Sequence, residues 1–253
     1  MRALLYRFIY KYLNPRLPQN QFWTGVKWRI ALILVGTEFH EYNLDENRDK
    51  LLIHFTSTRE LQIELSSLLD KLNLTETAKV LDVGAGPISK VGKIYRGAKI
   101  DLVAIDPVAN QYSRILKSLN LIPVVETVSG YGEKLTKQFQ LNFFDLIHAR
   151  NCIDHSKNPI LVIMEALRVL KPGGYFYLNH YLNEGQVAAY YGLHQWNFFE
   201  KNNLFYISNQ DHNIKICVDD EIRPLAIIEK IQRDHKRLIV IFKKDQLSKL
   251  EKS

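Results

Sequence analysis

The sequence predicts an α/β fold: a doubly wound, mainly parallel sheet with a C-terminal antiparallel hairpin and an N-terminal helical extension. From residue 79 onward, short apolar runs rich in β-branched residues alternate with helical patterns, which is typical of a parallel sheet. The length of 253 residues is enough to bury one large core. A composition of 46% hydrophobic and 24% charged residues is that of a globular protein.

Local patterns define the elements in order along the chain. Residues 1–57 are expected to form the extension, which is rich in aromatic residues. Ser57 and Glu60 fit a capping box that begins a helix over residues 58–72, where leucines recur at helical spacing. The predicted strands are residues 79–83, 100–105, 123–128, 144–149 and 175–179.

The second half of the chain carries equally clear signals. Asn158 can cap a helix whose first turn contains Pro159, and the Lys-Pro-Gly-Gly run at 171–174 ends it. Residues 227–232 and 238–242 flank a polar turn, which predicts the closing hairpin. Residues 243–253 are expected to be a solvated tail.

The net charge of +7 is concentrated at the N-terminus. Residues 1–37 hold six basic and no acidic residues, whereas the rest of the chain holds 28 basic and 27 acidic residues. This distribution disfavours a nucleic-acid partner and leaves an anionic membrane surface as a partner of residues 1–37. Leu4, Leu5, Phe8, Ile9 and Tyr12 have the spacing of an interfacial helix. The alternative is that this segment, with Trp23, Trp28 and Ile30, forms a lid or a dimer contact; the oligomeric state stays open.

Cysteine usage and hydropathy bear on the compartment. The two cysteines, Cys152 and Cys217, have no metal-ligand spacing, which favours a reduced, cytoplasmic protein. The longest apolar run, residues 30–35, is far shorter than the roughly 20 residues that a membrane-spanning helix needs. We therefore expect a cytoplasmic protein, with association at the inner face of the membrane as the variant that the N-terminus suggests.

A glycine turn follows the first predicted strand. Gly84-Ala85-Gly86 lacks the side chains that would keep a ligand from the backbone. Asp106 follows the next strand, 20 residues after Gly86, where a carboxylate can accept two ribose hydroxyl protons. Together these features predict a nucleoside-type ligand.

The identity of that ligand rests on a resemblance. A dinucleotide fingerprint would have Gly where this chain has Ser89, whereas Asp82 lies inside the strand before the turn. This segment resembles motif I of the class I S-adenosylmethionine-dependent methyltransferases, and residues 130–135, 144–151 and 170–174 resemble the family's later motifs in the same order. The resemblance implies a Rossmann-like methyltransferase domain over residues 58–242.

The same resemblance implies which residues bind S-adenosylmethionine. The methionine part would pass the glycine turn with its ammonium near Asp82, the ribose would bind Asp106, and the adenine would lie between Tyr131 and Glu133. Many family members carry Asp in place of Tyr131, so stacking or backbone contact is expected there. Asp82 as a helix cap and Asp106 as a turn former are the alternatives. The implied cofactor residues are Asp82, Gly84, Ala85, Gly86, Asp106, Pro107, Tyr131, Glu133, Arg150 and Asn151.

Three histidines are the candidate catalytic residues. His155 follows the fourth strand, His180 ends the fifth and His194 comes shortly afterward, so all three converge at the ligand edge. Methylation of a hydroxyl requires loss of its proton, and histidine is suited to accept it. Hydrogen bonds within loops are the alternative role for each. A metal site is the rival explanation, but no metal is expected because tight helical pairs are missing among Asp154, His155, His180, Glu184 and His194.

A narrower resemblance concerns the acceptor. Asp154-His155 with the segment 194–198 resembles bacterial methyltransferases of glycan-assembly clusters, which implies polysaccharide biosynthesis and O-methylation of a sugar. The insertion 186–220 would then build the acceptor pocket, or alternatively an aromatic core of its own. We expect methyl transfer to a hydroxyl of a small or carbohydrate acceptor. The alternatives are a nucleic-acid methyltransferase, although the Asn/Asp-Pro-Pro-aromatic box is missing after Arg150, and a non-catalytic S-adenosylmethionine-binding partner protein.

Overall fold

A computed structural model describes residues 28–47, 51–210 and 214–246, together with Leu5, Tyr6, Phe8, Ile9, Lys11 and Val26. Leu4 and Tyr12 of the expected interfacial helix, Trp23 and residues 247–253 of the expected tail lie outside these residues. Within the described part, no helix is long and apolar enough to cross a membrane.

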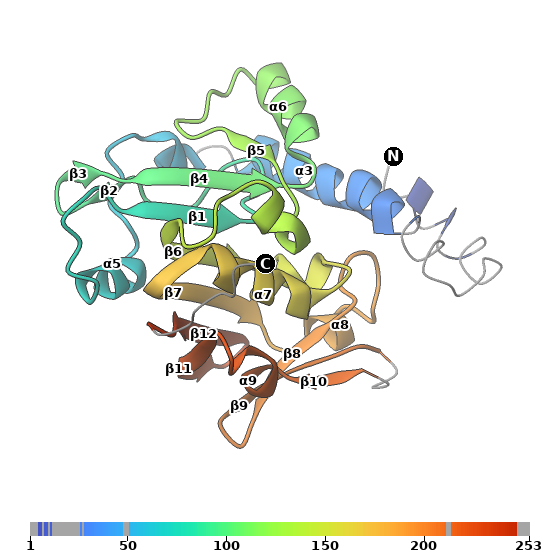
Figure 1. Ribbon diagram of the computed structural model, residues 1–253. Helices are drawn as coiled ribbons and strands as arrows, with labels where there is room; N and C mark the ends of the chain where they lie inside the picture. Colours follow the sequence, from blue (N-terminus) through green and yellow to red (C-terminus); the bar gives the residue numbers. More distant parts are fainter. Residues whose placement is uncertain are drawn as a thin grey trace.

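A seven-stranded sheet in the order β11-β12-β7-β6-β1-β4-β5 forms the centre of the molecule (Figure 1). The five strands from β7 to β5 pair in parallel, and β12 pairs antiparallel with β7 and β11. The predicted fold class, including the C-terminal hairpin, is therefore confirmed. The strands are β1 (Lys79–Val83), β4 (Asp101–Asp106), β5 (Thr127–Ser129), β6 (Phe144–Arg150), β7 (Leu170–Tyr181), β11 (Ala226–Asp234) and β12 (Arg237–Lys244).

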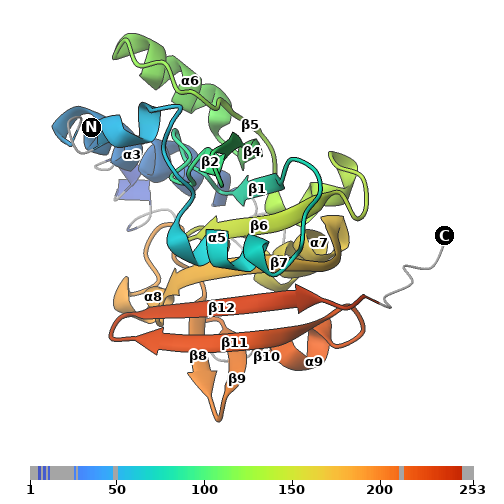
Figure 2. The same ribbon diagram turned by 90° about the vertical axis from the view of Figure 1, so that its left-hand side faces the viewer.

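Helices cover both faces of the sheet, as Figure 2 shows for α5 and α7. The leucines of α5 pack with Val80 and Tyr175 on one face, while α7 packs with Leu81 and Phe176 on the other. Near the β5 edge, α3 packs against α6. The helices of the described residues are the π-helix η3 (Leu32–Gly36), α3 (Thr37–Glu46), η4 (Leu52–Phe55), α5 (Ile63–Asp70), α6 (Ala109–Ser118), η5 (Gly132–Lys137), η6 (Ile153–His155), α7 (Pro159–Val169), α8 (Glu184–Val187) and α9 (Val218–Ile222).

Several predicted boundaries differ from the structure. The capping box is wrong, because α5 begins after Gln62 and Glu60 instead forms a β-bridge with Ile94. The third predicted strand shortens to β5, which begins only at Thr127. Asn158 does cap α7, accepting a hydrogen bond from the backbone N–H of Leu161 at 3.1 Å.

The run at 171–174 ends α7 but also belongs to β7. Leu170 pairs with Phe144 and Tyr175 pairs with Leu146, so five residue steps on β7 match two on β6. Residues 171–174 therefore bulge out of the ladder, and Gly173 adopts a φ of +78° there.

The segment between β7 and β11 adds a second, three-stranded sheet in the order β10-β9-β8. Its strands are β8 (Asn197–Lys201), β9 (Leu204–Ser208) and β10 (Lys215–Cys217), and a small hairpin elsewhere consists of β2 (Ile94–Tyr95) and β3 (Ala98–Lys99). Phe198 and Phe205 from this insertion are fully buried in the main core beside α7. These two aromatic residues therefore belong to the core of the fold.

Candidate functional site

The turn after β1 lets a ligand lie directly against the backbone. Gly84 and Gly86 have φ values of +65° and +68°, a region that favours glycine. A Cβ atom at Gly84 would lie 2.4 Å from the Cβ of Cys152, so no larger residue fits there. Ala85 lies between the glycines, and its N–H donates to the carbonyl of Ile105 at 3.0 Å. This bond ties the turn to the end of β4.

Asp106 ends β4 beside the turn. Its buried carboxylate accepts hydrogen bonds from the backbone N–H groups of Gly86 at 3.2 Å and of Val108, which follows Pro107, at 3.0 Å. Burial raises the pKa of Asp106 to about 6, although these two bonds oppose the rise. Each oxygen accepts one of these bonds and keeps a lone pair, so the carboxylate can still accept from two ribose hydroxyls. The residues present therefore fit the adenosyl group.

Asp82 does not cap a helix. One carboxylate oxygen pairs with Nδ1 of His148 at 2.7 Å, and the other accepts from the hydroxyl of Ser89 at 2.6 Å. The serine that breaks the dinucleotide fingerprint thus fixes the acid beneath the turn. His148 is buried and stacked on Tyr177.

The expected adenine pair faces the N-terminal segment. Tyr131 is 38% exposed, and its ring lies 6.3 Å from that of Trp28. Glu133 accepts a hydrogen bond from the backbone N–H of Lys157 at 3.0 Å, so its carboxylate is partly engaged. Trp28 also donates from Nε1 to the carbonyl of His155 at 2.5 Å. The tryptophan thus joins the expected adenine and acceptor sides of the crevice.

Arg150, the last residue of β6, and Asn151, which follows it, have different surroundings. Arg150 is exposed at the strand end, whereas Asn151 accepts a hydrogen bond from Nη2 of Arg237 at 3.1 Å. The sequence reasoning missed His40 of α3. A Cβ atom at Gly86 would lie 3.1 Å from Cε1 of His40, so this ring covers the glycine turn. No local signal marks His40, because only the packing of α3 on α6 brings it there.

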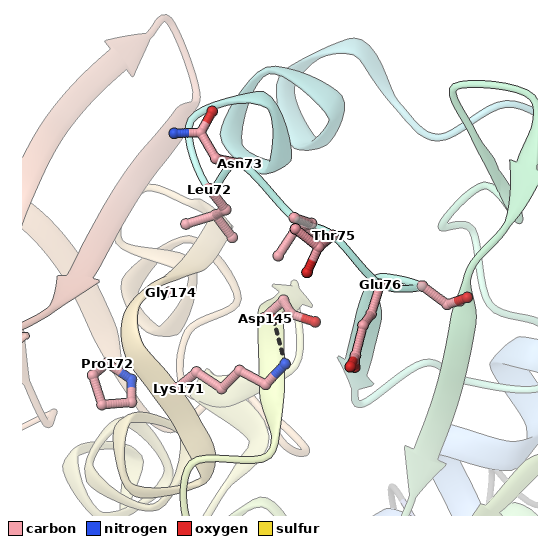
Figure 3. Close-up of a pocket in the computed structure, with 10 residues that line it drawn as sticks. Leu72, Asn73, Thr75, Glu76, Asp145, Lys171, Pro172 and Gly174 are labelled. Atoms are coloured by element: carbon pink, nitrogen blue, oxygen red, sulfur yellow. Dashed lines mark hydrogen bonds and ion pairs between the residues drawn. The ribbon is translucent and has the colours of Figure 1, made fainter.

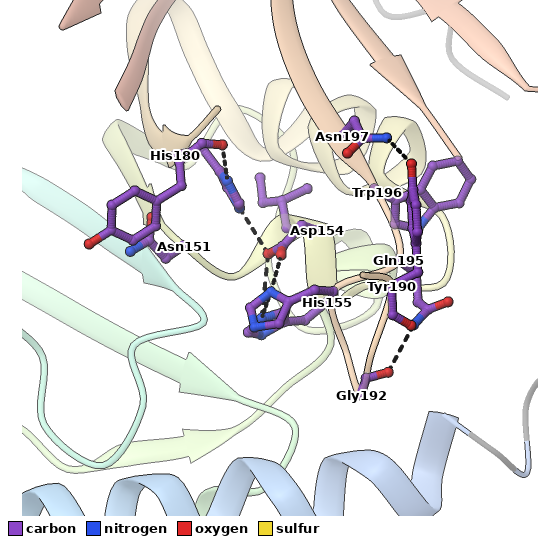
Figure 4. Close-up of polar contacts among 12 residues, drawn as sticks. Asn151, Asp154, His155, His180, Tyr190, Gly192, Gln195, Trp196 and Asn197 are labelled. Atoms are coloured by element: carbon purple, nitrogen blue, oxygen red, sulfur yellow. Dashed lines mark hydrogen bonds and ion pairs between the residues drawn. The ribbon is translucent and has the colours of Figure 1, made fainter. Parts of the chain in front are cut away.

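The three candidate histidines meet at one carboxylate, that of Asp154 in η6 (Figure 4). One oxygen accepts from Nε2 of His180 at 2.9 Å and the other from Nδ1 of His194 at 2.7 Å. Nε2 of His155 lies 3.6 Å from the first oxygen and 3.2 Å from Nδ1 of His194. The predicted convergence of these side chains is therefore found, although they come from three separate segments.

Burial and charge set the protonation of this cluster. Burial alone would raise the pKa of Asp154, but the charges of His155 and His180 and two hydrogen bonds lower it well below its usual range. Burial lowers the pKa of His155 to about 4, against the pull of Asp154. Burial also acts to lower the pKa of His194, yet the hydrogen bond and charge of Asp154 raise it overall. At neutral pH the cluster thus combines an ionised acid with a neutral His155.

Exposure separates the three histidines. The side chains of His155 and His194 are 31% and 35% exposed, whereas that of His180 is 1% exposed. Both ring nitrogens of His180 face acceptors, Asp154 and the carbonyl of Tyr181. His180 is therefore not placed to contact an acceptor directly, unlike the catalytic role expected from the sequence.

A group of potential metal ligands also meets here, although the sequence shows no helical pairing among them. Asp154, His155 and His194 offer ligand atoms within 4.8 Å of one another. Tertiary packing replaces the sequence spacing on which the expectation rested. Glu184 is not part of this group of potential ligands in the described residues.

A separate cavity of about 350 Å³ lies at the opposite edge of the sheet (Figure 3). There Asp145 accepts from the backbone N–H of Lys79 at 2.8 Å and from Nζ of Lys171 at 2.6 Å. Asp145 thus ties strand starts together, and ligands of open α/β sheets bind at the carboxyl ends of the strands instead.

Comparisons with known proteins agree with this geometry. Residues 81–178 match the family model described as "Methyltransferase domain". Phosphoethanolamine N-methyltransferase 1 of Arabidopsis thaliana is 32% identical over 130 residues, covering 50% of this chain and 26% of that protein. Sterol 24-C-methyltransferase of Debaryomyces hansenii is 31% identical over 117 residues, covering 43% and 29%. The chain thus spans little more than a quarter of these curated relatives.

Solved structures include similar chains. A putative S-adenosylmethionine-dependent methyltransferase of Methanococcus maripaludis has a TM-score of 0.48 and 16% identity, covering 83% of this chain and 92% of that one. For 1,6-didemethyltoxoflavin-N1-methyltransferase of Burkholderia thailandensis the TM-score is 0.47 and the identity 14%, covering 83% and 87%. The glycine turn, Asp106 and the match of residues 81–178 to a methyltransferase domain agree with a Rossmann-like fold that takes S-adenosylmethionine as its cofactor.

Proposed function

We propose that this protein transfers the methyl group of S-adenosylmethionine to a hydroxyl of a small or carbohydrate acceptor, such as a unit of a bacterial surface glycan. The observation that carries the proposal is the pairing of Asp154 with His194 next to the cofactor turn. Cys152, two residues before Asp154, packs on Gly84 and donates its thiol to the carbonyl of Val83 at 3.1 Å. The cluster and the turn are thereby held as one unit.

His194 is the candidate base. Because its Nδ1 donates to Asp154, the lone pair resides on Nε2, and the ring is partly exposed. Asp154 thereby fixes the tautomer and raises the basicity of the outward nitrogen. His155 is less suited, since its pKa of about 4 makes it a weak base.

The chemistry requires alignment and one proton transfer. S-adenosylmethionine supplies a methyl group on a positively charged sulfur, which leaves as the thioether of S-adenosylhomocysteine. His194 takes the hydroxyl proton as the acceptor oxygen forms its bond to the methyl carbon, which contributes about 10² to 10⁴ in rate. Trp28 and His40 cover the crevice from the N-terminal side and limit access of water.

The hydroxyl is favoured over an amine on chemical grounds. A neutral amine attacks without prior loss of a proton, so a buried acid that orients a histidine adds little to its methylation. The two curated relatives are named for N- and C-methylation, so the acceptor atom of this chain rests on the cluster and on the resemblance to glycan-cluster enzymes.

The loop before β8 lies beside the proposed acceptor site, but its side-chain amides are bonded to the protein itself. Gln195 donates to the carbonyls of Tyr190 and Gly192, both at 2.9 Å, and the Asn197 amide donates to the Tyr190 hydroxyl at 2.7 Å. These amides brace the loop instead of facing a sugar. Trp196 donates to the carbonyl of Ser156 at 3.0 Å, which fixes the indole beside η6.

The test supplies radiolabelled S-adenosylmethionine with nucleotide sugars, lipid-linked glycans, small alcohols or RNA. We expect label in a hydroxyl-containing saccharide or alcohol, a loss of about 100-fold or more for His194→Ala, and no loss for His235→Ala in the exposed hairpin turn. Label in RNA alone, or binding of the cofactor without any transfer, would establish the nucleic-acid or partner-protein alternative. Loss of activity with a chelator and recovery with a divalent cation would assign the cluster to a metal.

A further inference from the structure

Four cationic residues beside the cofactor turn act electrostatically on His54 and form what we call the basic cluster: Arg59, Lys90, Lys93 and Arg150. Nη1 of Arg59 contacts Nδ1 of His54 and donates to the carbonyl of Lys90 at 2.9 Å. Nζ of Lys93 donates to the carbonyl of His54 at 3.0 Å. His54 therefore lies at the centre of the basic cluster.

The basic cluster has no matching acid. Within residues 28–47, 51–210 and 214–246, none of its four cations forms an ion pair with a carboxylate. Asp82 acts on Lys90 and Lys93 from a distance, but its oxygens are bonded to other side chains. Lys93 is 5% exposed, and an unpaired buried charge is costly.

The charges of the basic cluster lower the pKa values of the basic groups among them. Burial and then the charges of Arg59, Lys90, Lys93 and Arg150 lower the pKa of His54 to about 4. Burial, Arg150 and Arg59 also lower the pKa of Lys90. The region thus carries a positive potential that a bound anion would relieve.

The basic cluster adjoins both parts of the crevice. Lys90 directly follows Ser89, whose hydroxyl is bonded to Asp82 beneath the glycine turn. The charges of Lys90 and His155 both act on His40, the ring that covers Gly86. An anion bound by the basic cluster would therefore lie near both the methyl donor and the proposed base.

We propose that the basic cluster binds a phosphate or diphosphate group of the methyl acceptor. The cofactor itself does not balance four cations, because its single carboxylate is accompanied by an ammonium and a sulfonium. Guanidinium and ammonium groups together suit phosphate oxygens, which accept several charge-assisted hydrogen bonds. The inference rests on the proposed function, since it names the charge of that acceptor; sugar nucleotides and lipid-linked diphosphates share this chemistry.

The binding test uses inorganic pyrophosphate, titrated calorimetrically into the full chain saturated with S-adenosylhomocysteine. We expect binding that weakens with added salt and falls about tenfold in Lys90→Gln and in Arg59→Gln, the size expected for a lost charge-assisted contact. Lys99→Gln, an exposed cation on β3, is the matched control and should bind as the wild type does. Equal affinity in all variants, or displacement of pyrophosphate by S-adenosylhomocysteine, overturns the proposal.

The kinetic test separates this inference from the proposed function. Wild type and Lys90→Gln are compared on a sugar nucleotide, a lipid-linked diphosphate sugar and a neutral glycoside of the same sugar. We expect the variant to lose kcat/KM on whichever phosphorylated acceptor the wild type prefers, and not on the neutral glycoside. If the wild type prefers the neutral glycoside, the phosphate site is overturned and the proposed O-methylation stands. If pyrophosphate binds but no O-methyl product forms, the proposed O-methylation is overturned and the phosphate site stands.

Discussion

Replacement of Asp154 by Asn tests the central pair of the proposed site. The carboxylate is fully buried and accepts from His180 at 2.9 Å and from His194 at 2.7 Å. Asparagine has nearly the same volume but a single acceptor oxygen, so its amide NH₂ would face one of the two imidazole N–H groups. The change therefore removes one charge-assisted hydrogen bond without opening a cavity.

The magnitude follows from that loss. A hydrogen bond to a charged group contributes about 1.5 to 3 kcal/mol, so we expect the free energy of unfolding to fall by about this amount. The kcat/KM should fall about 10² to 10⁴-fold, because His194 loses its fixed tautomer and its enhanced basicity. Asp154 raises the pKa of His194, and the base acts when deprotonated, so the acid limb of the pH–rate profile should move to lower pH in the variant.

The assay is kcat/KM for methyl transfer between pH 5 and 9, with urea unfolding in parallel. Asp145→Asn is the matched control, because Asp145 is equally buried and bonded but lies at the opposite edge of the sheet. It should lower stability and leave the pH–rate profile in place. An unshifted profile for Asp154→Asn, or a rate within tenfold of wild type, would refute the assignment of the Asp154–His194 pair.

Three further predictions follow from burial and backbone geometry. Binding of S-adenosylhomocysteine, measured by calorimetry, should weaken about tenfold per pH unit below pH 6, since the ribose selects the ionised form of Asp106; Asp106→Asn should remove this dependence. Gly92→Ala should lower the free energy of unfolding in urea by at least about 3 kcal/mol, because the new Cβ would lie 1.9 Å from the carbonyl oxygen of Glu60. Gly36→Ala is the control and should change the free energy of unfolding by no more than about 1 kcal/mol. Burial lowers the pKa of His40 to about 4 in the folded state, so the unfolded chain binds more protons between pH 4 and 6.5. The free energy of unfolding therefore decreases as the pH falls through that window. In His40→Gln, the slope of the free energy of unfolding against pH should correspond to about one proton less.

Much of the cofactor side was readable because it is local. The strand, glycine turn and following strand with Asp106 lie within 30 residues, and steric rules link such a sequence directly to its conformation. Boundaries failed where a distant partner intervened: Glu60 left the predicted helix because it pairs with Ile94. Periodicity describes one segment at a time and carries no information about such a bridge.

The acceptor side of the site depends more on tertiary structure than on local sequence. The sequence indicated that His155, His180 and His194 converge, since strand order places their segments at one edge. It could not indicate that all three share the carboxylate of Asp154, nor that His180 is sealed from solvent. Spacing rules failed for the metal alternative for the same reason, because the potential ligands come from two segments that are far apart in the chain.

The sequence by itself determined the fold class and the glycine turn, because these depend on short-range geometry that residue type dictates, and a family resemblance pointed to S-adenosylmethionine. Only the tertiary structure decided that His180 is sealed from solvent, that His40 covers the turn, and that Arg59 and Lys93 contact His54. Those features depend on burial and on electrostatic interactions between residues far apart in the chain, and both exist only once the core has packed.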